Sequence, residues 1–252
     1  MSARMMTIRP AASAVTEPAE HGRGEGPVFL GGGGSPADER DVWALAYAGV
    51  ERVLYWPFAL SGNILSTADQ WFRSSLASLD LHPEVVTWTS LAGRHGDELG
   101  EFDLLHVGGG NTFRLLDHIR HHEFLTPVRD FVHRGGGYYG CSAGAVIACA
   151  DIQIAASRDP NDVGLVDLDA LALVPTYSVL PHHDGDVERP VSWAREHHRA
   201  LIAIPERGGL RCWLGTFTAI GPDSSLEVAV DRVSVRPAGT SWTHESARGT
   251  PS

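Results

Sequence analysis

Short apolar runs alternate with amphipathic segments along most of this 252-residue chain. Runs rich in β-branched and aromatic residues are typical of buried strands, and the segments between them carry apolar residues at helical spacing. Repeated strand–helix–strand order gives right-handed crossovers and a mainly parallel sheet that helices cover on both faces. The sequence therefore predicts an α/β fold, with one domain and no internal repeat.

The individual elements can be placed by their residue ranges. The expected strands are 27–30, 52–58, 84–88, 102–107, 137–141, 170–174 and 177–180, and the expected helices are 38–49, 66–79, 112–119, 124–134, 142–149 and 187–202. From Leu210 the pattern changes to a C-terminal β meander over 210–216, 217–220, 226–230 and 232–236. We expect a disordered lead over 1–26, a single α/β domain over 27–236 and a polar tail over 237–252.

Charge and composition exclude several function classes. A net charge of −11 argues against nucleic-acid or membrane partners held by electrostatic attraction. The chain contains no Lys, so all 20 cationic side chains are Arg. This excludes a Schiff-base lysine, a P-loop lysine and a kinase-type lysine. Catalysis must therefore depend on hydroxyl, thiol, imidazole, carboxylate, guanidinium or metal chemistry.

Cysteine usage and hydropathy indicate a cytoplasmic protein without a membrane span. Three Cys residues do not make a disulfide framework, and no C-x-x-C pair suggests structural zinc. The apolar run Met5–Ile8 is too short for a signal peptide. No stretch approaches the roughly 18 uncharged apolar residues of a membrane helix. The seven Trp residues are consistent with either a core or a homodimer interface.

The strongest chemical signal is Gly140-Cys141-Ser142-Ala143-Gly144, between an expected strand and an expected helix. In a G-x-S-x-G elbow, a tight strand-to-helix turn exposes the serine oxygen above the sheet. The N–H of the following residue then faces the developing oxyanion. Ser142 is therefore the candidate nucleophile. Cys141 lies on the strand itself, which favours a structural thiol.

A serine nucleophile needs a base, normally a histidine oriented by a carboxylate. Among 13 His residues, His182 follows an expected strand and Pro181, at the strand end where open α/β sheets place their sites. The adjacent His183 is the alternative. Adjacent residues such as His182, His183 and Asp184 rarely ligate one ion together, so we expect no metal here, and hydrolysis by a serine triad needs no cofactor.

A second glycine-rich turn, Gly108-Gly109-Gly110-Asn111-Thr112, also joins a strand to a helix. It does not continue as G-x-G-x-x-G, and the chain has no lysine to accompany a phosphate site. Donation of the second half of an oxyanion hole fits this turn better than nucleotide binding.

These motifs together resemble peptidase family S51, the group of peptidase E and cyanophycinase. The resemblance rests on 107–113 (VGGGNTF), 140–145 (GCSAGA), 161–167 (NDVGLVD), 169–171 (DAL) and 181–182 (PH), and it extends over roughly 27–202. Several motifs in the same order are more specific than any one of them. The resemblance implies a class I glutamine-amidotransferase-like three-layer α/β sandwich.

The resemblance also implies roles for single residues. Ser142 would be the nucleophile and His182 the general base, with Asp162 as the third member of the triad and Asp159 as its competitor. The oxyanion donors would be the N–H groups of Gly109 or Gly110 and of Ala143.

The implied substrate is a short peptide, with an N-terminal Asp in the peptidase E case. Asn111 and Arg195 would bind it, and Arg189 is an alternative to Arg195. An acidic side chain must be bound by Arg in a chain without Lys, because a guanidinium pairs with a carboxylate in bidentate fashion.

Two other functions remain open at this point. Leu180 stands before Pro181 where the family usually has Asn, which leaves room for a binding or regulatory homologue without turnover. An esterase of the α/β-hydrolase type shares the Ser–Asp–His order. Its histidine, however, usually lies close to the C-terminus, whereas about 70 residues follow His182 here. Ser rather than Cys at the elbow disfavours an amidotransferase.

Overall fold

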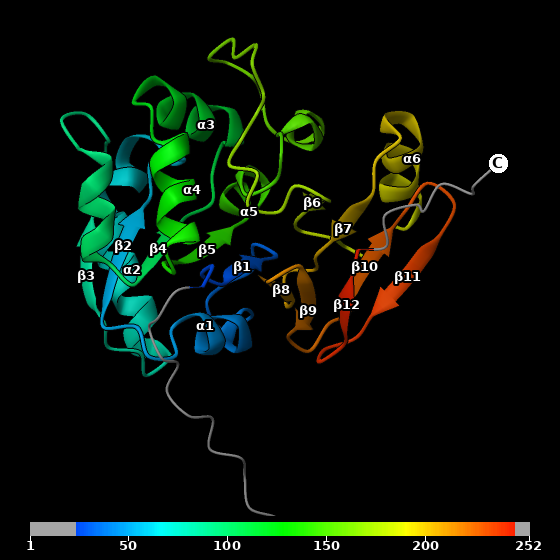
Figure 1. The fold of residues 1–252 in the computed structure, drawn as a ribbon, viewed down its shortest axis with the longest axis horizontal. Coiled ribbons are helices and arrows are strands. Elements are labelled where there is room, and N and C mark those ends of the chain that lie inside the picture. The colour runs from blue at the N-terminus through cyan, green and yellow to red at the C-terminus, as the bar shows by residue number, and fades with distance from the viewer. Residues whose placement is uncertain (1–23, 245–252) are drawn as a thin grey trace, which may run out of the picture.

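A computed structural model describes residues 24–244, which form an eight-stranded main sheet and a four-stranded second sheet. The main sheet has the order β12-β9-β8-β1-β5-β4-β2-β3 (Figure 1). Its strands are β1 (Val28–Gly31), β2 (Arg52–Trp56), β3 (Glu84–Thr87), β4 (Leu104–Val107), β5 (Gly137–Cys141), β8 (Gly209–Trp213), β9 (Thr216–Ile220) and β12 (Ser241–Thr243). Strands β1 to β5 run parallel, and β8, β9 and β12 are antiparallel additions beside β1.

The second sheet has the order β11-β10-β7-β6. Its strands are β6 (Ser178–Leu180), β7 (Leu201–Ala203), β10 (Ser225–Val228) and β11 (Val233–Arg236). Strands β6 and β7 are parallel neighbours, so their carboxyl ends lie at the same edge. That edge faces the end of β5, because the segment after β6 bonds to the segment after β1: the His182 N–H donates to the Gly32 carbonyl over 2.7 Å.

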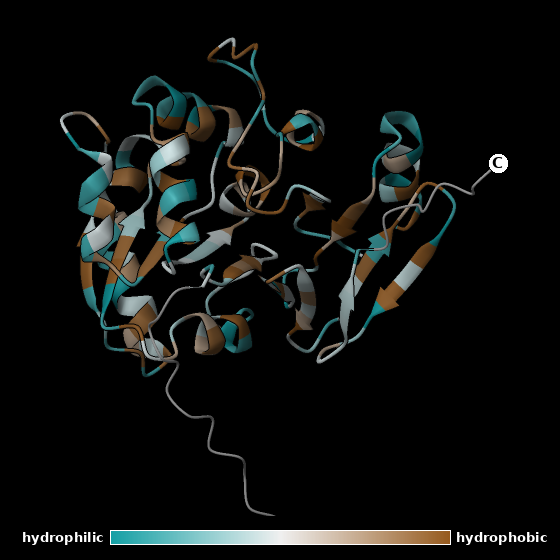
Figure 2. Cartoon of the chain, in the orientation of Figure 1, coloured by the Kyte–Doolittle hydropathy of each residue, from teal (hydrophilic) through white to brown (hydrophobic). Residues whose placement is uncertain are grey.

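Helices cover the main sheet on both faces, which gives the expected α/β sandwich. They are α1 (Arg40–Ala46), α2 (Gly62–Ser78), α3 (Thr112–His121), α4 (Leu125–His133), α5 (Ala143–Ile147) and α6 (Glu188–His197), with 3₁₀ turns at Gly96–Glu101 and Gln153–Ser157. In Figure 1, α1 and α3 lie on opposite sides of the sheet, and α6 accompanies the second sheet. Figure 2 shows brown and teal residues side by side on these helices, as amphipathic helices require.

Strand residues alternate between two hydrophobic clusters, one on each face of the main sheet. On β5, Tyr138 packs with residues of α3, α4 and α5, whereas Tyr139 packs with residues of α1 and α2. This alternation is the two-residue period of a pleated strand. The larger cluster continues into the second sheet through Val179, Leu201 and Leu226.

The expected elements differ from the structure at several places. The segment 170–174 does not form a strand: Val174 makes an isolated bridge with Cys149, and Asp169, just before the segment, makes another with Asp151. The helix expected over 187–202 ends at His197, because His198 adopts a left-handed conformation with φ 50° and ψ 40°. The last residues of that range belong to β7 instead.

The C-terminal strands also divide differently from a simple meander. β8 and β9 join the main sheet, whereas β10 and β11 join the second sheet. The expected polar tail over 237–252 contains β12, which pairs with β9 and buries Trp242 against Phe217. Most of the expected lead over 1–26 lies outside the described residues. At its end, the Gly26 N–H donates to the Val132 carbonyl over 2.7 Å.

Candidate active site

Ser142 occupies the turn between β5 and α5, in a conformation that few residues other than glycine adopt. Its φ of 52° and ψ of −109° place it in a strained region of backbone space. The turn is compact because glycines flank it. A Cβ on Gly140 would overlap the carbonyl of Gly144, and a Cβ on Gly144 would overlap the carbonyl of Val107. The G-x-S-x-G spacing therefore lets α5 start directly over the strand ends.

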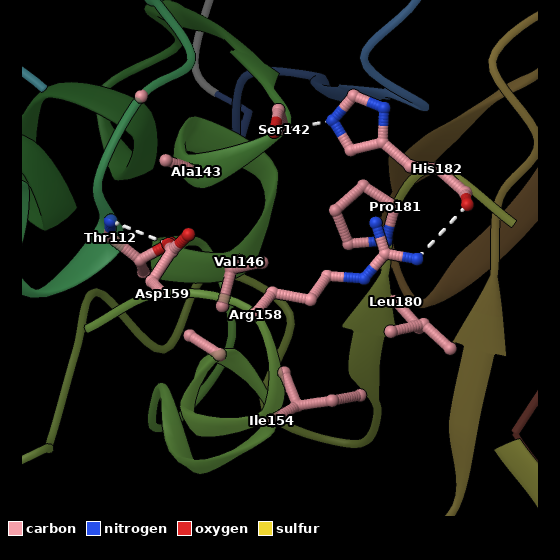
Figure 3. Close-up of a pocket in the computed structure, with 12 residues that line it drawn as sticks. Thr112, Ser142, Ala143, Val146, Ile154, Arg158, Asp159, Leu180, Pro181 and His182 are labelled. Carbon is pink, nitrogen blue, oxygen red and sulfur yellow. Dashed lines mark hydrogen bonds between the residues drawn. The ribbon is translucent and has the colours of Figure 1, made fainter. Parts of the chain in front are cut away.

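His182 provides the base for this serine. It follows β6 by two residues, with φ 54°, and its Nε2 atom lies 2.9 Å from the Ser142 Oγ atom. Figure 3 shows the imidazole pointing at the serine across the mouth of a pocket. His183, the alternative base, donates its backbone N–H to the Ile204 carbonyl, and its side chain lines a second cavity.

The carboxylate that meets His182 is Glu206. Its Oε1 atom lies 3.0 Å from His182 Nδ1. Glu206 follows β7 by three residues and His182 follows β6 by two, so the pair comes from the ends of two neighbouring parallel strands. The side chains are 30% exposed for His182 and 60% exposed for Glu206, which places the pair at the surface.

Asp162, expected as the third member, does not contact His182. Both of its carboxylate oxygens bind the Arg114 guanidinium, which holds the pKa of Asp162 below its ordinary value. Its competitor Asp159 accepts hydrogen bonds from the backbone N–H and the hydroxyl of Thr112, over 2.8 and 2.6 Å. In the structure, the expected carboxylate contact to the imidazole therefore comes from Glu206 instead.

Sequence reasoning misses Glu206 because the helix expected over 187–202 overlaps β7. Without a predicted strand before it, Glu206 is not expected at the edge where His182 lies. The signal was present nevertheless: the apolar run 200–204 is followed by Pro205 and Glu206, just as the run 177–180 is followed by Pro181 and His182.

A pocket of about 500 Å³ opens beside Ser142 and His182. It is lined by Gly110, Thr112, Ser142, Ala143, Val146, Ile154, Ala155, Arg158, Asp159, Leu180, Pro181 and His182. Arg158 and Asp159 are the charged side chains of this lining. Arg158 donates to the His182 carbonyl over 3.1 Å, and Figure 3 shows Thr112 and Asp159 on the side away from His182.

The other expected site residues divide into two groups. Gly110 and Ala143 line the pocket. Gly109 lies against the Ser142 side chain, because a Cβ on Gly109 would be 3.2 Å from the Ser142 Cβ. Asn111 caps α3 by accepting the Arg114 N–H, and it donates to the Pro160 carbonyl. Neither Asn111 nor Arg195, which is exposed on α6, is among the residues that line the pocket.

Cys141 does not compete with Ser142 in this geometry. Burial raises the pKa of its thiol well above the ordinary value, and the nearby Glu39 carboxyl raises it further. Because the thiolate is the nucleophilic form of cysteine, such a thiol is inert at neutral pH. Within residues 24–244, His, Cys, Asp and Glu side chains form no group of three or more that could hold a metal ion. No helix of this part of the chain is long and apolar enough to cross a bilayer.

Comparison with known proteins identifies the family. The model of peptidase family S51 matches residues 37–207. The chain belongs to peptidase family S51. It is 45% identical to peptidase E of Shigella sonnei over 196 residues, which cover 70% of this chain and 80% of the relative. It is 47% identical to peptidase E of Salmonella paratyphi A over 83 residues, but this match spans only 34% of the Salmonella protein.

Solved structures share the fold. A peptidase from an acI-B1 actinobacterium superposes with a TM-score of 0.66 at 19% identity, covering 87% of this chain and 97% of that one. A putative peptidase E from Listeria monocytogenes superposes with a TM-score of 0.60 at 22% identity, covering 85% of this chain and 100% of that one. The α/β fold of this S51 member, with its large mostly parallel sheet, is therefore that of peptidase E-like proteins.

Proposed function

We propose that this S51 member is a serine peptidase whose catalytic triad is Ser142, His182 and Glu206. The observation that carries the proposal is the chain of contacts from Ser142 Oγ to His182 Nε2, over 2.9 Å, and from His182 Nδ1 to Glu206 Oε1, over 3.0 Å. Both distances are within the range required for proton transfer and for orientation of the base.

In the proposed reaction, His182 Nε2 takes the hydroxyl proton as Ser142 Oγ attacks the peptide carbonyl. Glu206 accepts the Nδ1–H bond, which fixes the tautomer and stabilises the imidazolium. The N–H of Ala143 lies at the first position of α5, where the helix itself offers no acceptor. This amide and those of Gly109 or Gly110 would hold the oxyanion. The imidazolium then protonates the leaving amine, and water activated by His182 hydrolyses the acyl-enzyme.

The charges of the pocket support a substrate with an N-terminal Asp. Such a substrate presents a side-chain carboxylate and an α-ammonium group close together. The pocket offers the Arg158 guanidinium and the Asp159 carboxylate, which complement these two charges. Arg158 thus takes the role that the resemblance assigned to Arg195, because Arg158 lines the pocket of Ser142.

Replacement of the nucleophile tests the proposal. Ser142→Ala should lower the hydrolysis of Asp-p-nitroanilide by at least about 10⁴-fold. The exposed Ser66, on α2 away from the pocket, provides the control: Ser66→Ala should keep full activity. A fluorophosphonate probe should label the wild type at Ser142 and leave the Ser142→Ala protein unmodified.

Other outcomes would identify a different function. Full activity of Ser142→Ala would overturn the triad. A wild type that neither hydrolyses the anilide nor reacts with the probe would be a binding homologue without turnover. Rapid hydrolysis of a p-nitrophenyl ester without hydrolysis of the anilide would indicate an esterase.

A further inference from the structure

Glu39 is a buried carboxyl group that the proposed mechanism does not use. It immediately precedes α1 and is 1% exposed. It accepts hydrogen bonds from the Gly33 N–H over 2.6 Å, from the Trp43 indole over 3.3 Å and from the Tyr139 hydroxyl. All three donors are uncharged, and burial raises the pKa of Glu39 to about 7. Burying an acidic group in this way is costly, so its retention requires an explanation.

The contact with Gly33 connects this carboxyl to the proposed site. Gly33 belongs to the turn that follows β1, and the Gly32 carbonyl of the same turn accepts the His182 N–H over 2.7 Å. Gly33 has φ 95°, and a Cβ at this position would overlap the ring of His182. The imidazole therefore rests directly on the Gly33 backbone.

The same turn also contacts the segment that carries Glu206. A Cβ on Gly34 would overlap the Glu206 carbonyl, and the Gly32 N–H donates to the Gly208 carbonyl over 3.1 Å. The turn over 32–34 thus supports both the base and the residue that orients it. Glu39 binds this turn at its central N–H.

We propose that Glu39 is a positioning residue, which holds the Gly33 backbone against the His182 imidazole and so maintains the contact between Nε2 and the Ser142 hydroxyl. This inference rests on the proposed peptidase function. Without an acceptor, the half-buried Gly33 N–H would be unpaired, and the turn would relax away from the ring. A base misplaced by about 1 Å can cost on the order of 100-fold in rate.

The first experiment separates the contact with Gly33 from the general stability of the cluster. Glu39→Leu removes the acceptor of the Gly33 N–H and should lower kcat for Asp-p-nitroanilide at least about tenfold, with KM within about twofold. Glu39→Gln retains a carbonyl acceptor and should restore most of kcat. Tyr139→Phe is the matched control, since it removes another donor of the same carboxyl and leaves Gly33 bound. It should lower the melting temperature but keep kcat within about twofold.

Equal losses of kcat in Glu39→Leu and Tyr139→Phe would overturn the proposal, because the role would then be general packing. Unchanged kcat in a folded Glu39→Leu protein would overturn it as well. Should that variant not fold, Gly33→Ala provides the second test. Its methyl group enters the space of the imidazole and leaves the Glu39, Trp43 and Tyr139 side chains unchanged in sequence, so full kcat in Gly33→Ala would contradict the coupling between this turn and His182.

A spectroscopic measurement keeps this inference distinct from the peptidase proposal. The Nδ1 proton that His182 shares with Glu206 should give a downfield proton resonance in the wild type. The resonance should shift or broaden in Glu39→Leu and persist in Tyr139→Phe. A wild type without hydrolysis or probe labelling would refute the peptidase function, and this resonance would still decide whether Glu39 positions His182.

Discussion

Two clusters of a histidine and a carboxyl group lie near β5, one at the edge where the strand ends and the other buried on the face that α1 and α2 cover. The open cluster is Ser142, His182 and Glu206, where the His182 and Glu206 side chains are 30% and 60% exposed. The buried cluster contains Glu39 and His106, at 1% and 2% exposure, packed around Tyr139 and Trp43. Similar residue types therefore occupy two very different environments, although Tyr139 of the buried cluster and Ser142 of the open cluster lie only three positions apart in the chain.

The difference shows that a strongly shifted pKa indicates burial and does not by itself identify a catalytic group. Burial raises the pKa of Glu39 to about 7 and lowers that of His106 to about 3. Neither group faces a pocket beside a nucleophile. The open cluster is identified by its geometry instead: two short contacts in series beside a pocket. We accordingly expect substitutions in the open cluster to change rates and those in the buried cluster to change stability, with Glu39 as the exception because it also binds the Gly33 N–H. Gly33 contacts both clusters, because its N–H donates to Glu39 and its backbone lies against the His182 ring.

Apart from replacement of the nucleophile, the largest effect is expected at Glu206. Glu206→Gln should lower kcat/KM by about 10²–10⁴-fold, because the imidazole loses the carboxylate that fixes its tautomer. The melting temperature should change little, since the side chain is exposed. Asp162→Asn is the matched control, because Asp162 is paired with Arg114 and not with the imidazole. Its loss of activity should be at least about tenfold smaller. The reverse order of the two losses would return Asp162 to the triad.

The buried cluster should control how stability depends on pH, and its two titrating groups act in opposite directions. His106 has a folded-state pKa below its unfolded value of 6.5, so its contribution is lost as pH falls from 6.5 toward 3. Glu39 has a folded-state pKa above its unfolded value of 4.5, so the protein is destabilised as pH rises from 4.5 to 7.

Urea unfolding of paired variants measures both contributions. Between pH 7 and pH 4, the wild type should lose about 3 kcal/mol relative to His106→Asn. Between pH 4 and pH 8, it should lose about 3 kcal/mol relative to Glu39→Gln. Tyr139 and Cys141 are the other titratable groups beside Glu39, and burial raises the pKa of both well above this range. If the difference in unfolding free energy between the wild type and each variant does not vary with pH, burial does not shift the pKa of that group, and the buried cluster does not differ from the open one in this respect.

The sequence predicts two of the three residues of the open cluster, Ser142 and His182, because each follows a recognisable local pattern. Ser142 follows a strand that was predicted with its observed bounds, and a strand-to-helix elbow is a local motif. His182 follows a strand and a proline in the same local way. The position of Glu206 depends on the pairing of β7 with β6, which is a contact between distant segments. The sequence also predicts a helix over the start of β7, whereas the observed helix ends before His198. The buried cluster left no sequence signal, because nothing local distinguishes Glu39 from an exposed helix-start carboxylate.

The smallest effect is predicted for Arg158, and its measurement distinguishes binding of the substrate from support of His182. Arg158→Gln should lower kcat/KM for Asp-p-nitroanilide by about 10–100-fold, since a hydrogen bond to a charged group contributes about 1.5–3 kcal/mol. Hydrolysis of Ala-p-nitroanilide should change little, and Arg195→Gln, on the exposed face of α6, should change neither substrate by more than about twofold. Arg158 also donates to the His182 carbonyl, so the two substrates must be compared. Equal losses on both would mean that Arg158 supports the base, the role that we propose for Glu39, and that the acidic side chain is bound elsewhere.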